Sequence, residues 1–351
     1  MSLEVIYVTR HGFRSSWNVD PSTGTYTAAI RSPTGLPTDP ALTSHGVQQS
    51  NELATHLLNV EPPIEQVYSS PYYRCMQTIQ PFVSSLRRPR NQLSGNVSEE
   101  TKPKIRVEPA VSEWYGLAQF DHPSSAPLND LQTHFPELDA TYASALAPPR
   151  RGESLSQLHD RVAQAIDAII RRSDEEGHKA ILICTHAAVV IALGRVLTGQ
   201  MEYDFGAFTC GLSKYRRLSP HVAGGSIGGG ETAGTNAVSS TASSGKQIGD
   251  ATLLDIESVD GVDPYPHDSR QPHPHSLEGG KTGLYGGWTC ELDSDCSFLR
   301  GGEERGWTFS GDESFIETDG YGPWPDAGSR SDTAELMEAQ DYWDPLLYFF
   351  D

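Results

Sequence analysis

Apolar runs of strand length alternate with segments of helical periodicity near the start of the chain. The run EVIYV at 4–8 is typical of a buried strand, and residues 42–60 carry apolar side chains at the spacing of an amphipathic helix. IEQVYSS at 64–70 predicts a second buried strand, and the Ser-Pro pair at its end is typical of a helix start. Residues 12–41 are polar and rich in Pro, Gly and Thr, which predicts a long loop.

The same alternation returns later in the chain. Residues 151–172 contain Ser154 and Gln157 in a capping-box pattern, followed by apolar residues at helical spacing. KAILICT at 179–185 predicts a third buried strand, and the helix after it should end at Gly199. Strands that alternate with helices predict an α/β protein, a three-layer α/β/α sandwich with a mainly parallel sheet.

The composition changes near residue 219. Residues 224–246 form a low-complexity stretch of Gly, Ser and Thr, which predicts a flexible coil. A hydrophobic content of 37% is enough for one sizeable core but thin for two. We therefore predict a domain over 1–218, a flexible linker over 219–280 and a largely irregular, partly disordered C-terminal region over 281–351. The first part is expected to fold and act without the others.

The negative charge is concentrated in the C-terminal part. The formal charge of the chain is -20, and residues 221–351 hold 6 Lys and Arg against 24 Asp and Glu. Such a field disfavours direct binding to nucleic acid and favours a basic protein as partner. Aromatic residues among these acids suggest anchors for a partner's groove, at Trp288, Trp307, Trp324 and Trp343. The alternative is a tail that covers the domain's own surface.

Cysteine usage and the absence of long apolar runs suggest the compartment. The five cysteines are scattered and odd in number, which suits a reducing environment. There is no apolar run of about 18 residues and no signal-peptide pattern. We expect an intracellular protein, cytoplasmic or nuclear, that does not bind membranes. The paired His273 and His275 fit an exposed polar linker better than a metal site.

Charged and nucleophilic residues follow the predicted strands. His11 comes directly after the first strand, Arg74 comes just after the second, and His186 follows the third. Because ligands of parallel sheets bind beyond the carboxyl ends of the strands, we expect these three side chains to share one edge of the sheet. Arg10 and Arg14 flank His11 in the sequence.

These residue types suit phosphoryl transfer. A neutral His11 imidazole has the lone pair needed to attack phosphorus and to carry the phosphate as a phosphohistidine. Arg10, Arg14 and Arg74 can bind the phosphate oxygens with planar guanidinium groups, and a protonated His186 adds another donor. Chemistry of this kind needs neither a metal nor a cofactor.

Six motifs in order resemble the histidine phosphatase superfamily, which has the phosphoglycerate mutase-like fold. The motifs are TRHG (9–12), LTSHGVQQ (42–49), SSPYYRCMQT (69–78), SEWYG (112–116), RGES (151–154) and CTHAAVV (184–190). The resemblance covers about residues 1–218. It implies an α/β sandwich and hydrolysis of phosphate monoesters.

The resemblance also implies a role for each matching residue. His11 would be the phosphorylated histidine, Arg10 and Arg74 would bind phosphate, and His186 would be the second histidine of the pocket. Glu113 would be the acid that protonates the leaving group. Glu108 is a nearby rival for that role.

Two positions depart from the pattern of many members. Phe13 and Arg14 stand where those members have Glu or Gln followed by Ser or Thr. Arg14 instead resembles an RHGxR subgroup with protein-tyrosine-phosphatase-like members and a fungal branch that includes the tau subunit of transcription factor IIIC. Phe13 removes a carboxylate from the pocket rim, which disfavours a small, multiply charged sugar phosphate as substrate.

Three functional hypotheses follow. The first is a metal-independent phosphatase, acting on a phosphoprotein such as one with phosphotyrosine or on a small phosphate ester. The second is a non-enzymatic or weakly active subunit of a complex like RNA polymerase III transcription factor IIIC. The third is a phosphoglycerate mutase-type phosphotransferase, which is disfavoured because residues 1–220 carry a net charge of only -2.

Overall fold

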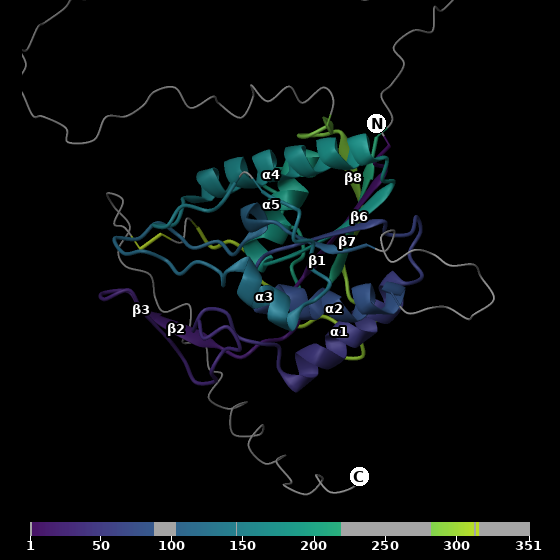
Figure 1. The fold of residues 1–351 in the computed structure, drawn as a ribbon. Coiled ribbons are helices and arrows are strands. Elements are labelled where there is room, and N and C mark those ends of the chain that lie inside the picture. The colour runs from purple at the N-terminus through teal and green to yellow at the C-terminus, as the bar shows by residue number, and fades with distance from the viewer. Residues whose placement is uncertain (1, 88–102, 145, 219–281, 312–313, 316–351) are drawn as a thin grey trace, which may run out of the picture. The chain divides into compact units, whose positions relative to one another are not determined.

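A six-stranded sheet forms the centre of the protein. The computed structural model describes residues 2–87, 103–144, 146–218, 282–311 and 314–315 (Figure 1). The strand order is β5-β4-β6-β1-β7-β8. The strands are β5 (Ile105–Val107), β4 (Gln66–Ser69), β6 (Ala180–Thr185), β1 (Val5–Arg10), β7 (Leu212–Arg217) and β8 (Trp288–Asp295).

The sheet is mainly parallel, as the sequence predicts. Strands β5, β4, β6 and β1 run parallel, with Val5 opposite Ala180 and Val67 opposite Leu182. β7 pairs antiparallel with β1, and β8 pairs antiparallel with β7. The central strands are buried on both faces, which explains why their sequences are continuous apolar runs.

Helices cover both faces of the sheet (Figure 1). α1 (Ser44–Leu57), α2 (Tyr73–Arg87) and α3 (Leu128–His134) lie on one side, and α4 (Leu155–Glu176) and α5 (Ala187–Thr198) lie on the other. The α/β/α sandwich is therefore confirmed. Among the described helices, none is both long enough and apolar enough to cross a membrane.

The helix ends follow the predicted capping chemistry. The hydroxyl of Ser154 accepts the N–H of Gln157, and the Gln157 side chain accepts the N–H of Ser154, which completes a capping box. Gly199 ends α5 with φ 76°, a left-handed conformation that glycine adopts without strain. These local signals fix where the helices begin and end, and thus which residues lie at the strand-to-helix turns.

The loop predicted at 12–41 contains a β-hairpin. β2 (Trp17–Asp20) pairs antiparallel with β3 (Thr25–Ala28). The carboxylate of Asp20 accepts hydrogen bonds from Ser22 and Thr23 and so shapes the turn. Strands of four residues with polar outer faces are too short to show a periodicity in the sequence, which is why the loop prediction was wrong here.

The sheet continues beyond the predicted domain boundary at 218. β8 lies in the region 281–351 that the sequence analysis placed outside the domain. Trp288 is 2% exposed, and its indole N–H donates to the carbonyl of Thr282, so it does not anchor a partner. Trp307 packs near Trp114. The described residues do not include the predicted linker, the two tryptophans Trp324 and Trp343, or the paired His273 and His275.

Candidate active site

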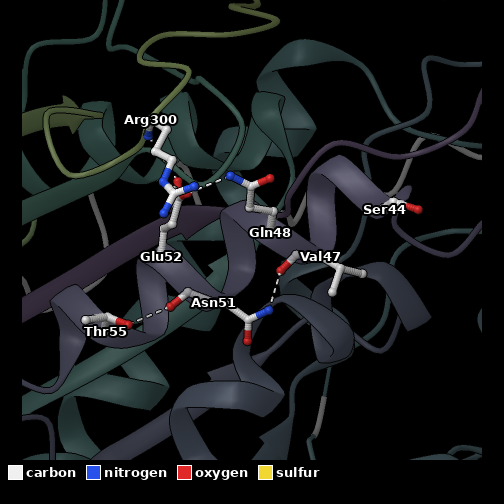
Figure 2. A pocket seen from close by; sticks show the side chains of 7 residues that line it. All are labelled: Ser44, Val47, Gln48, Asn51, Glu52, Thr55 and Arg300. Atoms are coloured by element: carbon white, nitrogen blue, oxygen red, sulfur yellow. Dashed lines mark hydrogen bonds and ion pairs between the residues drawn. The ribbon is translucent and has the colours of Figure 1, made fainter. Parts of the chain in front are cut away.

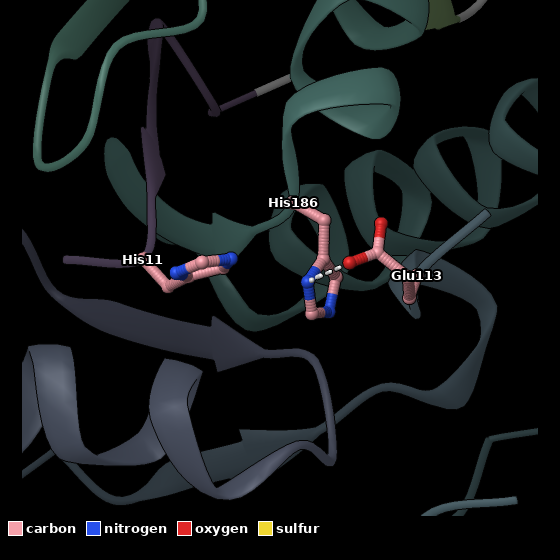
Figure 3. A group of neighbouring side chains, drawn as sticks. All are labelled: His11, Glu113 and His186. Carbon is pink, nitrogen blue, oxygen red and sulfur yellow. Dashed lines mark ion pairs between the residues drawn. The ribbon is translucent and has the colours of Figure 1, made fainter. Parts of the chain in front are cut away.

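The residues that follow the strands meet at one edge of the sheet. His11 follows β1, Arg74 lies in the first turn of α2 after β4, and His186 caps α5 after β6. His11 is 2% exposed, and the other two are completely buried. Ligand-type atoms of His11, Glu113 and His186 all lie within 4.8 Å of one another (Figure 3). The predicted convergence on the carboxyl edge is therefore observed.

The RHG turn is held against α1 and α2. The N–H of Gly12 donates to the hydroxyl of Thr78 at 3.0 Å, and the N–H of Phe13 donates to the Gln49 side chain at 2.9 Å. A Cβ atom on Gly46 would lie 2.0 Å from the carbonyl oxygen of Phe13. Only glycine allows this approach, which explains the glycine in the LTSHGVQQ motif.

The ring of His11 is held by a hydrogen bond to the backbone. Its Nδ1 lies 2.9 Å from the carbonyl oxygen of Gly12. Because a carbonyl can only accept, Nδ1 carries the hydrogen and Nε2 keeps its lone pair. Burial lowers the pKa of His11 well below 6.5, and the positive charges of Arg74 and His186 add to this effect. His11 is therefore a neutral imidazole at neutral pH.

His186 is arranged as a cation. Its Nε2 lies 2.8 Å from the hydroxyl of Ser70, and its Nδ1 lies 3.2 Å from the Glu113 carboxylate. Burial lowers the pKa of His186, but negative charge at Cys75 and Glu113 outweighs it, so the net shift is upward. When protonated, the ring can donate Nε2–H to Ser70 and Nδ1–H to Glu113, whereas an unprotonated Nδ1 can accept from Nη2 of Arg74, which lies 3.1 Å away. Figure 3 shows this ring between His11 and Glu113.

Arg74 is fixed by partners on both sides of its guanidinium. Nη1 donates to the carbonyl of Thr38 at 2.8 Å, and Nη2 donates to Glu113 at 3.0 Å. The guanidinium lies over the ring of Tyr72 at 4.6 Å, and its Nε has no partner among the described residues. An unsatisfied buried donor is costly, so a ligand oxygen at this position would be favourable.

Asp39 is a site residue that the sequence analysis missed. Its carboxylate is completely buried, 3.7 Å from Arg74, and it accepts the N–H of Tyr73 at 2.7 Å. Burial raises its pKa to about 6, although Arg74 opposes the shift. A buried arginine requires a nearby carboxylate, but nothing in the polar loop marks which acid supplies it.

Arg10 and Arg14 add positive charge without a matching acid. Nη1 of Arg10 donates to the carbonyls of Ala207, at 2.7 Å, and Arg305, while its Nε has no partner among the described residues. Arg14 donates to the carbonyl of Ser15. Burial lowers the pKa of Arg10 to about 10 and that of Arg14 to about 9, so both remain cations at neutral pH. Within the described residues, neither has a carboxylate within 4.0 Å.

The structure brings Glu113, and not Glu108, to the two histidines. The Glu108 carboxylate caps the short helix Pro109–Val111 and accepts the hydroxyls of Tyr142 and Ser144. Burial raises the pKa of Glu113, but His186 and Arg74 lower it more, so the net shift is well below 4.5. Its carboxylate occupies donors of Arg74 and His186.

The cluster of two histidines and a glutamate offers three metal-ligand types, but its hydrogen bonds do not suit a metal. A ligating imidazole must be neutral with a free nitrogen, whereas the raised pKa of His186 favours its protonated form, whose nitrogens face Ser70 and Glu113. We therefore expect any phosphatase activity of the chain to be unchanged after dialysis against EDTA. An activity that EDTA removes and Mg²⁺ or Zn²⁺ restores would contradict this expectation.

A second surface feature lies on the outer face of α1. A depression of about 420 Å³ is lined by Val47 and five polar residues of α1 and by Arg300 (Figure 2). Gln48 donates to Glu52 there at 2.9 Å, and Nε2 of the neighbouring His45 lies 2.6 Å from the Glu304 carboxylate. The depression contains none of the predicted catalytic residues.

Comparison with known proteins gives relatives of two kinds. The chain is 32% identical over 231 residues to the transcription factor tau 55 kDa subunit of Saccharomyces cerevisiae, covering 62% of this chain and 48% of that protein. It is 31% identical over 173 residues to the ecdysteroid-phosphate phosphatase of Drosophila melanogaster, covering 48% and 21%. The chain thus spans at most about half the length of these relatives.

Among solved structures, the chain is similar to the ecdysone phosphate phosphatase from Bombix mori in complex with tungstate. The TM-score is 0.44 and the sequence identity is 20%, and the match covers 65% of this chain and 96% of that one. The family model described as "Histidine phosphatase superfamily (branch 1)" matches residues 6–227. This match covers more than half of the chain and includes every residue of the His11 cluster. The chain therefore belongs to the histidine phosphatase superfamily.

Proposed function

We propose that the protein is a phosphomonoester hydrolase that acts through a phosphohistidine at His11 and needs no metal. One observation carries this proposal: a neutral imidazole with a free Nε2 lies near more cationic side chains than carboxylates. Arg10 and Arg74 each keep a buried Nε without a protein partner among the described residues. Both nitrogens are suited to phosphate oxygens.

The reaction would take two steps. Nε2 of His11 attacks phosphorus, the bond from phosphorus to the ester oxygen breaks, and Glu113 gives its proton to that oxygen. Water then attacks the phosphohistidine, Glu113 takes a proton from the water, and inorganic phosphate leaves as His11 is restored. Arg10, Arg74 and protonated His186 would bind the phosphoryl oxygens in both steps.

The state of Glu113 would change with the ligand. In the free site its contacts with Arg74 and His186 hold its pKa well below 4.5. A bound phosphate takes over those donors and adds negative charge beside the carboxylate. Both changes raise the pKa of Glu113, so the substrate itself prepares the acid that the first step needs.

The Glu113→Gln variant tests this role. It should lose roughly 10²–10⁴-fold in kcat on alkyl phosphates, whose leaving oxygen requires a proton, and far less on aryl phosphates such as 4-nitrophenyl phosphate. Steady-state kinetics on both substrate types measures the difference. Equal losses on the two types would show that Glu113 is not the proton donor and would leave solvent in that role.

The pH dependence follows from the two histidines. His11 has a lowered pKa, so it stays neutral until the pH is well below 6.5. His186 has a raised pKa, so its positive charge persists above 6.5 and disappears as the pH rises further. We expect kcat/KM to stay high in mildly acidic buffer and to fall on the alkaline side. A profile that rises through pH 7 to 9 would contradict the assigned charges.

Aromatic side chains beside the pocket favour an aryl phosphate, such as protein phosphotyrosine, as substrate. The Tyr72 ring lies 5.3 Å from His186, and its hydroxyl lies 3.1 Å from that of Tyr115. Trp17 of the hairpin lies 6.1 Å from Tyr115 and near Arg14. A panel of phosphotyrosine peptides, phosphoserine peptides and small alkyl phosphates tests this preference.

A second candidate function is a subunit of a complex like transcription factor IIIC, with low or no activity. The identity of 32% to the yeast tau 55 kDa subunit supports it. It would place the protein in the nucleus, bound to a protein partner. Affinity capture of the native and His11→Ala chains distinguishes the two functions. A scaffold keeps its partners without His11, whereas an enzyme loses its activity.

A further inference from the structure

A short segment after β8 contacts the RHG turn. We call residues Gly302–Trp307 the C-terminal loop; it lies outside residues 6–227, which the family model matches. The carbonyl of Glu304 accepts the N–H of Thr209 at 3.1 Å, and Thr209 lies in the segment before β7. The loop is therefore held beside Thr209 and Arg10, although more than 290 positions separate it from His11.

The carboxylate of Glu304 links the loop to the first turn of α1. Oε2 lies 2.6 Å from Nε2 of His45 and accepts Nε2–H of Gln49 at 3.0 Å. Oε1 of the same Gln49 amide accepts the N–H of Phe13, two positions after His11. Glu304 is therefore one bonded side chain away from the turn that carries the nucleophile.

The next residue reaches Arg10 directly. The carbonyl of Arg305 accepts Nη1–H of Arg10, together with the carbonyl of Ala207. Two carbonyls on one nitrogen fix the plane of the guanidinium and leave its Nε unused by the protein. Arg305 itself has φ 48°, a left-handed conformation that residues other than glycine rarely adopt, and its guanidinium lies 4.1 Å from the Phe13 ring.

We propose that Glu304 is a positioning residue for phosphate binding. By anchoring the C-terminal loop to His45 and Gln49, it places the Arg305 carbonyl so that Arg10 presents its free donors to the phosphoryl oxygens. The inference rests on one part of the proposed function, namely that Arg10 binds the phosphoryl group. Glu304 touches neither the substrate nor the reacting atoms and acts through Arg10.

The test is oxyanion affinity of the full chain, measured by isothermal titration with tungstate and with inorganic phosphate. The Glu304→Ala variant should bind tungstate about tenfold more weakly, because small misplacement of a binding group is costly. Glu303→Ala is the matched control, since it removes the same charge from the adjacent, exposed residue. It should change the affinity less than twofold.

A double-mutant cycle separates positioning from a merely structural role. In an Arg10→Ala background, Glu304→Ala should change the tungstate affinity less than twofold, because there is no Arg10 left to position. A tenfold effect that persists without Arg10, or equal effects of Glu304→Ala and Glu303→Ala, would overturn the proposal. If Glu304→Ala does not fold, Glu304→Gln enters the same cycle and should give a smaller effect with the same dependence on Arg10.

Binding and turnover report on different claims. A native chain that binds tungstate with this coupling but hydrolyses no monoester refutes the hydrolase and leaves the positioning role intact. A native chain that hydrolyses substrate without the coupling refutes the positioning role alone. A native chain that binds neither oxyanion overturns the positioning role, because Arg10 then has no ligand to hold.

Discussion

The His11→Ala chain is expected to lose roughly 10⁴–10⁶-fold in kcat/KM on any monoester that the native chain hydrolyses, because the nucleophilic route disappears with the imidazole. Alanine also removes the hydrogen bond to the Gly12 carbonyl but leaves the backbone of the turn in place. The oxyanion donors of Arg10 and Arg74 should remain, so tungstate should still bind.

The covalent intermediate gives the direct measurement. Rapid quench of the native chain with labelled substrate should trap a phosphoenzyme that is labile in acid and stable in base, as expected for phosphohistidine. His178→Ala is the control, because His178 follows α4 outside the site and contacts Glu176. Unchanged turnover in His11→Ala, or a phosphoenzyme that survives this substitution, would end the assignment.

A chain that stops at residue 218 is expected not to fold stably, in contrast to the domain boundary that the sequence predicts. Removing β8 leaves β7 as an unpaired edge and strips buried Trp288, Cys296 and Leu299 from the core. Loss of one large buried side chain costs about 3–5 kcal/mol, and the net stability of a domain is only about 5–15 kcal/mol. A chain that stops at residue 315 keeps all of these contacts.

Thermal melting of the two truncated chains measures the effect. Within the full chain, Trp288→Ala should lower the melting temperature clearly, whereas Leu292→Ala on the same strand should stay within about 0.5 kcal/mol of the native stability. Leu292 is 38% exposed, against 2% for Trp288. A 1–218 fragment that melts cooperatively near the native temperature would show that β8 is dispensable.

The parallel sheet and the meeting of His11, Arg74 and His186 follow from local information. Continuous apolar runs mark strands buried on both faces, and caps such as Ser154 mark where helices begin. Once the strands are parallel, whatever follows each of them lies at the same edge. The chemistry of this edge is therefore readable before any contact is known.

Other parts depend on contacts that no local pattern encodes. β8 is an edge strand with half of its side chains exposed, so its sequence resembles a polar loop, and its partner β7 lies about 70 positions earlier. Asp39 and Glu304 are ordinary acids in polar stretches, and only the fold brings them to Arg74 and to the segment before β7. Burial of an acid beside an arginine is a property of the packed chain.

The contact of Glu113 with Arg74 and His186 has a consequence for the last step of the proposed reaction. Inorganic phosphate, once formed, needs the same donors, and the tethered carboxylate competes for them at a high effective concentration. Each return of the carboxylate favours dissociation of the product. In the proposed reaction, the side chain assigned to supply the proton would thereby also weaken product inhibition and clear the site for the next ester.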